Sequence, residues 1–205
     1  MSWFKRGRER SSEDPGRWVV VGLGNPGERY ASTRHNLGAM TIDELLQRSS
    51  GRLKSHKSGC LIAEVSVSGE PVVLARPTTY MNDSGRPVGQ LVRFFRTPSE
   101  RVIVIHDELD IPFGDVRVKA GGGTAGHNGL RSIVNHLGTQ EFARVRMGIG
   151  RPRGDQDAVK KVLDSFSSAE RKELPEVLGS AADAVETIVS SGVERAMNAF
   201  NTRQR

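Results

Sequence analysis

The chain has 205 residues, a length typical of one globular domain, and 36% of them are hydrophobic. It carries 30 Lys and Arg against 24 Asp and Glu, and this net charge of +6 favours a polyanionic partner. A single cysteine, Cys60, excludes an internal disulfide, and no apolar run approaches the ~20 residues that span a bilayer.

The N-terminal residues 1–17 are charged and lack the apolar segment of a signal peptide. We expect them to form a disordered tail, followed by one domain over residues 18–205 without repeats or linkers. A chain with one cysteine suits a reducing compartment, so we expect a cytoplasmic protein without a membrane partner.

Apolar periodicity predicts the elements of the first half. Residues 18–23 form a short apolar strand, and residues 33–49 carry apolar side chains at helical spacing. Residues 60–67 and 71–75 flank a short turn that contains Gly69, so the two segments are expected to pair as a β-hairpin.

The second half continues this alternation of strands and helices. After a polar loop at residues 151–157 the chain is expected to be helical, with breaks at Pro175 and Gly192. Strands interspersed with helices, plus one hairpin, predict a single α/β domain with a twisted mixed β-sheet flanked by helices. The other expected elements are a helix at 86–96, strands at 102–105 and 111–118, a helix at 127–137 after a glycine-rich run, and a strand at 143–150.

Residues 22–27, GLGNPG, match the G-x-G-x-x-G pattern of dinucleotide-binding loops. In that fold the last glycine opens a helix, and an acidic residue about 20 positions later binds the ribose. Here that position is Gln47, inside the predicted helix, and the next strand belongs to a hairpin. We therefore expect no nicotinamide or flavin cofactor. Glycines on both sides of Asn25 instead allow a sharp turn that would hold this amide at the end of a strand.

The TRHN stretch, which contains His35, is one of four polar stretches at element boundaries. The other three lie where a strand gives way to a loop or helix, or where a glycine run opens a helix. Open α/β sheets build their ligand sites at such boundaries. The histidines, carboxylates and three primary amides in these stretches can activate water and bind an oxyanion, which favours hydrolysis of an activated acyl group. The three stretches are YMNDSG at 80–85, HDELD at 106–110 and GGGTAGHNG at 121–129.

Other chemistries have weaker support in the sequence. No G-x-S-x-G occurs, and Cys60 lies in a predicted strand, where a small buried side chain is expected. A metal site could be assembled from the histidines and acids of these stretches, but neither H-E-x-x-H nor paired-cysteine spacing supports it, so no metal is expected. His106 adjoins a buried strand and is expected to be structural.

Most of the excess positive charge lies between Pro112 and Arg153. Two acidic residues, Asp115 and Glu141, oppose the basic residues of this segment, and a phosphate-bearing partner is therefore expected there first. The basic residues are Arg117, Lys119, Arg131, Arg144, Arg146, Arg151 and Arg153.

The chain resembles bacterial-type peptidyl-tRNA hydrolases in the stretches GLGNPGERYASTRHNLG, RPTTYMNDSG, HDELD, GGGTAGHNGLRSI and RVRMGIGRP. These motifs have the family's order and spacing over about residues 18–200. The resemblance implies the family's phosphorylase/hydrolase-like α/β fold. It also implies an enzyme that cleaves the ester between a nascent peptide and tRNA, and so recycles tRNA from stalled or abortive translation.

The same resemblance implies roles for individual residues. His35 is the general base, Asp107 orients it, and Asn25 is assigned to catalysis with them. Lys119 and Arg146 contact the tRNA. A flap over the cleft corresponds to about residues 151–165. The substrate-binding residues are Tyr30, Met81, Asn82, His127 and Asn128.

The implied partner is peptidyl-tRNA, bound by its acceptor stem, its 3′ end and the C-terminal residues of its peptide. No cofactor is expected, and the protein is expected to be a monomer. An alternative is a non-catalytic RNA-binding protein on the same fold, which could lack the base and its acid. The presence of His35, Asp107 and all three asparagines favours an active enzyme.

Overall fold

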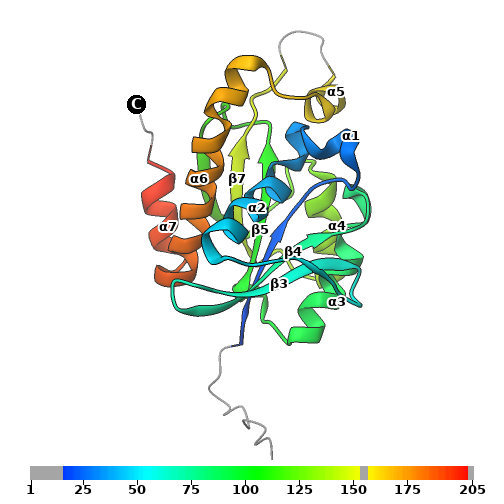
Figure 1. Ribbon diagram of the computed structural model, residues 1–205, viewed down its shortest axis with the longest axis vertical. Coiled ribbons are helices and arrows are strands. Elements are labelled where there is room, and N and C mark those ends of the chain that lie inside the picture. Colours follow the sequence, from blue (N-terminus) through cyan, green and yellow to red (C-terminus); the bar gives the residue numbers. More distant parts are fainter. Residues whose placement is uncertain (1–15, 153–156, 203–205) are drawn as a thin grey trace, which may run out of the picture.

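The computed structural model describes residues 16–152 and 157–202, which contain a seven-stranded sheet in the order β2-β3-β4-β1-β5-β7-β6 (Figure 1). Strands β4, β1, β5 and β7 run parallel, whereas β2, β3 and β6 run antiparallel to their neighbours, so the predicted mixed sheet is confirmed. The strands are β1 (Trp18–Gly22), β2 (Lys54–Ser55), β3 (Cys60–Val67), β4 (Glu70–Pro77), β5 (Val102–Glu108), β6 (Val116–Ala120) and β7 (Ala143–Gly148).

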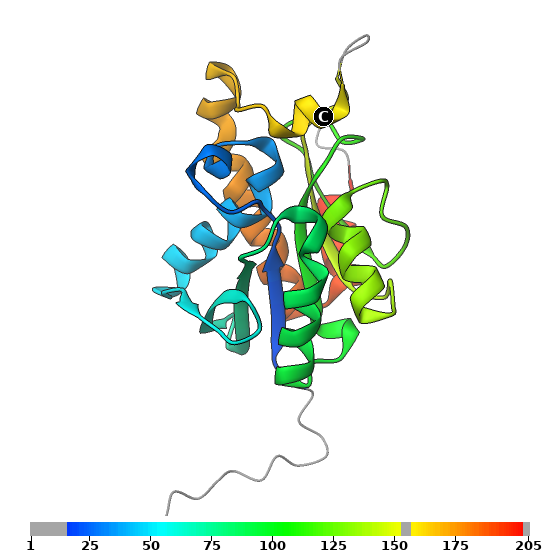
Figure 2. The same cartoon turned by 90° about the vertical axis from the view of Figure 1, so that its right-hand side faces the viewer.

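Helices cover both faces of the sheet (Figure 2). One face packs against α2 (Leu37–Ser49), α6 (Ser168–Ser191) and α7 (Val193–Phe200), and the other packs against α3 (Gly85–Phe95) and α4 (Asn128–Leu137). Strand β1 is buried on both faces: Trp18 and Val20 lie in the first core, and Val19 and Val21 lie in the second. The continuous apolar run that starts at Trp18 is therefore explained by a central parallel strand.

The C-terminal region differs from the prediction at Pro175. Helix α6 continues through this proline, although a proline inside a helix removes one backbone hydrogen bond. A capping box between Ser167 and Glu170 fixes the helix start, and apolar residues from Val177 onward pack on the sheet, so both sides of the proline are held. The break at Gly192 is confirmed, and the helical region also divides at residues 164–167, after α5 (Ala158–Leu163).

The parallel strands bring the predicted polar stretches to one edge of the sheet. Their carboxyl ends point to the top of Figure 1, where the loops after β1 and β4 and the end of β5 meet. The loop after β1 contains a one-turn helix, α1 (Glu28–Ala31), which the apolar pattern did not indicate, and a 3₁₀ turn, η1 (Arg34–Asn36), at the start of the segment predicted to be helical from residue 33.

The described residues begin at Gly16, so most of the predicted tail lies outside them. Arg17 is described: its guanidinium pairs with Glu64, and its carbonyl oxygen accepts a hydrogen bond from Thr97. Within residues 16–152 and 157–202, no helix is both long enough and apolar enough to cross a membrane.

Candidate active site

A cleft of about 660 Å³ opens at the carboxyl edge of the sheet. All three predicted catalytic residues and all five predicted substrate-binding residues line it, from loops that are far apart in sequence. These eight residues are Asn25, Tyr30, His35, Met81, Asn82, Asp107, His127 and Asn128.

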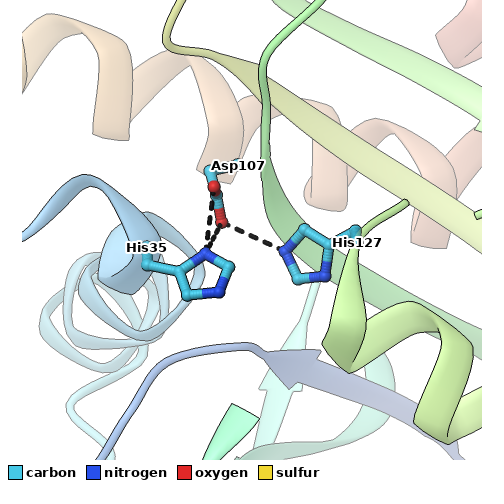
Figure 3. Close-up of side chains that lie close together, drawn as sticks. All are labelled: His35, Asp107 and His127. Carbon is cyan, nitrogen blue, oxygen red and sulfur yellow. Dashed lines mark hydrogen bonds and ion pairs between the residues drawn. The ribbon is translucent and has the colours of Figure 1, made fainter. Parts of the chain in front are cut away.

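The centre of the cleft is a hydrogen-bonded pair of His35 and Asp107 (Figure 3). Nδ1 of His35, on η1, lies 2.9 Å from Oδ1 and 3.1 Å from Oδ2 of Asp107, the penultimate residue of β5. Burial alone would raise the pKa of Asp107, but the adjacent His35 and His127 hold it well below its usual range, so this carboxyl is ionised. An ionised acceptor requires a proton on Nδ1 of His35, so in the neutral imidazole the lone pair is on Nε2.

His127 is the second imidazole that contacts Asp107, and its proton position is determined by helix α4. It is the N-cap of α4: its Nδ1 accepts hydrogen bonds from the backbone N–H groups of Gly129 at 3.1 Å and Leu130 at 3.3 Å. The proton must therefore be on Nε2, which lies 3.1 Å from Oδ1 of Asp107 and donates to it. Asp107 thus accepts from two imidazoles at once.

The same geometry tests whether His35, Asp107 and His127 could hold a metal ion, since their ligand atoms lie within 4.8 Å of one another. A metal on Nε2 of His127 would displace the proton that faces Asp107. That proton would have to move to Nδ1, where two backbone N–H donors already point. The donor set therefore fits a hydrogen-bonded triad better than a metal centre.

His106 is structural, as the strand pattern suggested. Burial is the main cause that lowers the pKa of its imidazole to about 3, so the ring is neutral. Its Nδ1 donates to the backbone oxygen of Asp107 at 2.7 Å, and its ring packs edge-on against His127 with centroids 5.0 Å apart. His106 therefore helps to hold Asp107 and His127, which contact each other, in place.

Asn25 is held by two other residues in a defined orientation. Its backbone N–H donates to Oδ1 of Asn36 at 2.8 Å, and its backbone oxygen accepts from Nδ2 of Asn36 at 2.9 Å. Its side-chain oxygen accepts from the backbone N–H of Met81 at 2.8 Å, which leaves the NH₂ group to donate. Asn36 was not singled out in the sequence, although its position directly after His35 in the same polar stretch was a usable signal.

The other two amides lie at the wall of the cleft. Oδ1 of Asn128, the first residue of α4, accepts from Arg131 at 2.7 Å, so its NH₂ group is also available as a donor. Asn82 is exposed at the cleft. Gly129, next to Asn128, permits close packing, because a Cβ there would lie 2.6 Å from Sδ of Met81.

An apolar roof completes the cleft, in the region where the resemblance implied a flap. Helix α5 contributes Ala158, Val159, Val162 and Leu163 to the lining, and Tyr80 and Leu109 add to the apolar surface. In Figure 1, α5 lies above the carboxyl ends of the strands, beside α1. The predicted flap at residues 151–165 includes α5, whereas its residues 153–156 lie outside the described part of the chain.

The two residues predicted to contact tRNA do not line the cleft. Lys119 and Arg146 are half-buried on the antiparallel strands β6 and β7, where Arg146 is opposite Arg117. One basic residue of the segment from Pro112 to Arg153 does not fit the expected phosphate contact. Arg144 is buried, and its guanidinium donates to the backbone oxygens of Gly122 and Gly123. It shapes the glycine-rich loop and is not free to meet a phosphate.

Comparison with known proteins places the chain in a family. The sequence model of the family described as peptidyl-tRNA hydrolase matches residues 19–205. The peptidyl-tRNA hydrolase of Frankia alni is 53% identical over 188 residues, which cover 92% of this chain and 95% of the relative. That of Mycolicibacterium vanbaalenii is 54% identical over 181 residues, covering 88% and 94%. The crystal structure of peptidyl-tRNA hydrolase from Acinetobacter baumannii has a TM-score of 0.86 at 37% identity and covers 94% of this chain and 98% of that chain. The chain therefore belongs to the peptidyl-tRNA hydrolase family.

Proposed function

We propose that the protein hydrolyses peptidyl-tRNA with His35 as the general base that activates water. Membership of the family makes it an enzyme that cleaves the ester between peptide and tRNA. The observation that carries the proposed mechanism is the bond between Nδ1 of His35 and the ionised Asp107, because it leaves a basic Nε2 at the cleft.

In the first step, Nε2 of His35 takes a proton from water as the water oxygen bonds to the ester carbonyl carbon. Asp107 stabilises the imidazolium that forms. In the second step, the carbon–oxygen bond to the ribose breaks, and the imidazolium returns its proton to the leaving ribose oxygen. The products are a peptide carboxylic acid, which loses its proton to solvent at neutral pH, and a tRNA with a free terminal ribose. General-base catalysis of this kind contributes roughly a hundred- to ten-thousandfold in rate.

The amides supply the remaining polar contacts. The NH₂ group of Asn25 is oriented by Met81, so it can donate to the negative charge that develops on the carbonyl oxygen. Asn82 and Asn128 bind the peptide backbone near the ester, and Tyr30, Met81 and His127 form the adjoining wall.

Lys119 and Arg146 bind acceptor-stem phosphates beside the cleft, which places the 3′ end of the tRNA at His35. Burial is the first cause that lowers the pKa of Arg146, and a bound phosphate would relieve that cost by pairing with the guanidinium. We infer a monomer acting in the cytoplasm on the 3′ end of tRNA and the C-terminal residues of the peptide.

The test is hydrolysis of an N-acetylated aminoacyl-tRNA in H₂¹⁸O, with free aminoacyl-tRNA and His35→Ala as controls. We expect one ¹⁸O atom in the released carboxylate, none in the tRNA, and little cleavage by His35→Ala. Binding of the substrate without turnover would instead support the non-catalytic RNA-binding alternative. Label in the tRNA would contradict attack at the carbonyl carbon.

A further inference from the structure

Helix α5 forms much of the cleft roof although it packs only weakly on the rest of the protein, through the half-buried Val162. None of its six residues is buried, and Val159 and Leu163 are 61% and 39% exposed. Apolar side chains that face an open cleft gain little free energy by burial. The position of α5 therefore depends mainly on attachments near its ends, one of which is Phe166 in the core.

The polar attachment at its C-terminal end is made by Arg34. The backbone N–H of Arg34 donates to the backbone oxygen of Asp164 at 3.3 Å. Nη1 of Arg34 donates to the same oxygen at 3.1 Å and to that of Ser165 at 2.9 Å. Thr33 forms a β-bridge with Ser165. The residue that precedes His35 thus binds the two residues that directly follow α5.

The same guanidinium also reaches helix α6. Nη2 of Arg34 lies 2.6 Å from Oε2 of Glu170, and the two side chains are only 7% and 16% exposed. Oε2 of Glu170 also accepts the backbone N–H of Ser167 in the capping box of α6. The ring of Phe166 packs against the guanidinium at 5.4 Å. Arg34 therefore connects the end of α5, the start of α6 and the turn that carries His35.

We propose that Arg34, held by Glu170, is a positioning residue that fixes the roof helix α5 at a set height above His35. The inference rests on the proposed function in one respect, since it takes the cleft below α5 as the place of the peptide. Arg34 does not touch the reacting atoms. It keeps α5 where the apolar roof can contact the peptide, and its loss should weaken peptide binding more than the chemical step.

Two variants test the connection without removing the base. Arg34→Lys keeps the charge but cannot bridge two backbone oxygens and a carboxylate with one planar group, and Glu170→Gln removes the charge of the partner. If α5 is in its competent position only about a tenth of the time in these variants, KM should rise about tenfold. The turnover number should stay within about twofold, because His35 and Asp107 keep their contact.

Arg48→Lys is the matched control. Arg48, near the C-terminal end of α2, also joins its helix to α6, through Asp183 and Glu186, and none of these residues belongs to α5. Its replacement should leave KM unchanged. Amide hydrogen exchange provides a second readout: residues 159–164 should exchange faster in Glu170→Gln than in the parent, and the strands of the sheet should not.

A disulfide can replace the Arg34 connection. The hydroxyl oxygens of Ser32 and Ser165 lie 3.3 Å apart on exposed residues, so Ser32→Cys with Ser165→Cys should form a bond on treatment with oxidised glutathione. Cys60 should not compete, because it is buried and burial raises the pKa of its thiol to about 11. In the Arg34→Lys background, oxidation should restore the parent KM, and reduction should raise it again.

The proposal is overturned if Arg34→Lys and Glu170→Gln leave KM within twofold of the parent, or if the formed disulfide fails to restore it. It is also overturned if both variants lower only the turnover number. Failure of the general-base mechanism would appear separately, as a His35→Ala enzyme that turns over normally while the roof variants still change KM.

Discussion

Replacement of Asp107 by asparagine is the perturbation whose outcome the site geometry constrains most closely. The carboxylate gives one oxygen to both imidazoles, at 2.9 Å from His35 and 3.1 Å from His127, and its second oxygen lies 3.1 Å from His35. An asparagine has the same shape but one oxygen and one NH₂ group. Because the α4 cap fixes the His127 proton on Nε2, the amide oxygen must take the shared position.

The NH₂ group of the asparagine then takes the position of the second oxygen, 3.1 Å from Nδ1 of His35, where it competes with the amide oxygen, which lies 2.9 Å from the same nitrogen but is shared with His127. A donor there favours the His35 tautomer with a bare Nδ1 and a protonated Nε2, and that tautomer cannot take a proton from water. The negative charge that stabilises the imidazolium is also lost. Both effects lower the turnover number, and by analogy with a wrong-tautomer substitution in a catalytic triad we expect a loss of about 10³- to 10⁴-fold, or roughly 4–5 kcal/mol.

Two measurements check this expectation. Single-turnover cleavage of N-acetylated aminoacyl-tRNA gives the rate of the chemical step, and ¹⁵N NMR of the imidazoles reports which nitrogen of His35 carries the proton. We expect the rate to fall, the His35 proton to move to Nε2, and substrate affinity to change little. A rate within tenfold of the parent would refute the reasoning, as would a large loss of rate with the His35 tautomer unchanged.

Three further predictions concern neighbouring residues. His127→Ser should keep the helix cap but lose the contact to Asp107, so thermal unfolding should place its stability about 1 kcal/mol above that of His127→Ala, while both lose activity; equal stabilities would contradict the capping role. Lys119→Ala should raise KM and reduce the slope of log affinity against log salt by about one, with kcat retained; an unchanged slope would argue against a phosphate contact. The pKa of His106 is about 3 in the folded protein and about 6.5 in the unfolded chain, so between these pH values the unfolded state binds one more proton. The free energy of unfolding should therefore fall as the pH falls through this range. Denaturant titrations of His106→Asn should show a pH slope smaller by about one proton, and an unchanged slope would contradict a neutral His106.

The sequence predicts those site residues that lie at the end of a recognisable strand. The apolar run that ends in HDELD indicates a buried strand, and the parallel order of β4, β1 and β5 then brings its Asp107 beside the loops after the other two. The hairpin of β3 and β4 was predicted because a short turn with Gly69 separates two strand-like segments. Each of these signals is a short contiguous stretch, so it can be recognised in a single sequence.

What could not be predicted depends on contacts between distant residues. Nothing near Arg34 in the sequence indicates that its guanidinium binds residues 164, 165 and 170, and nothing in the helical region predicted from residue 158 indicates that α5 ends at Leu163. Arg144 read as a basic surface residue because charge alone does not reveal that a guanidinium is buried against a loop. Pro175 read as a helix end, but tertiary packing of α6 on the sheet outweighs its local preference.

The central claim is that His35 removes a proton from water while other residues bind the tRNA. The most direct measurement compares single-turnover cleavage and equilibrium substrate binding for the parent and His35→Ala. We expect the cleavage rate to fall by roughly 10²- to 10⁴-fold, with the dissociation constant within about threefold of the parent. A variant that binds the substrate poorly, yet cleaves what it binds at the parent rate, would contradict the account.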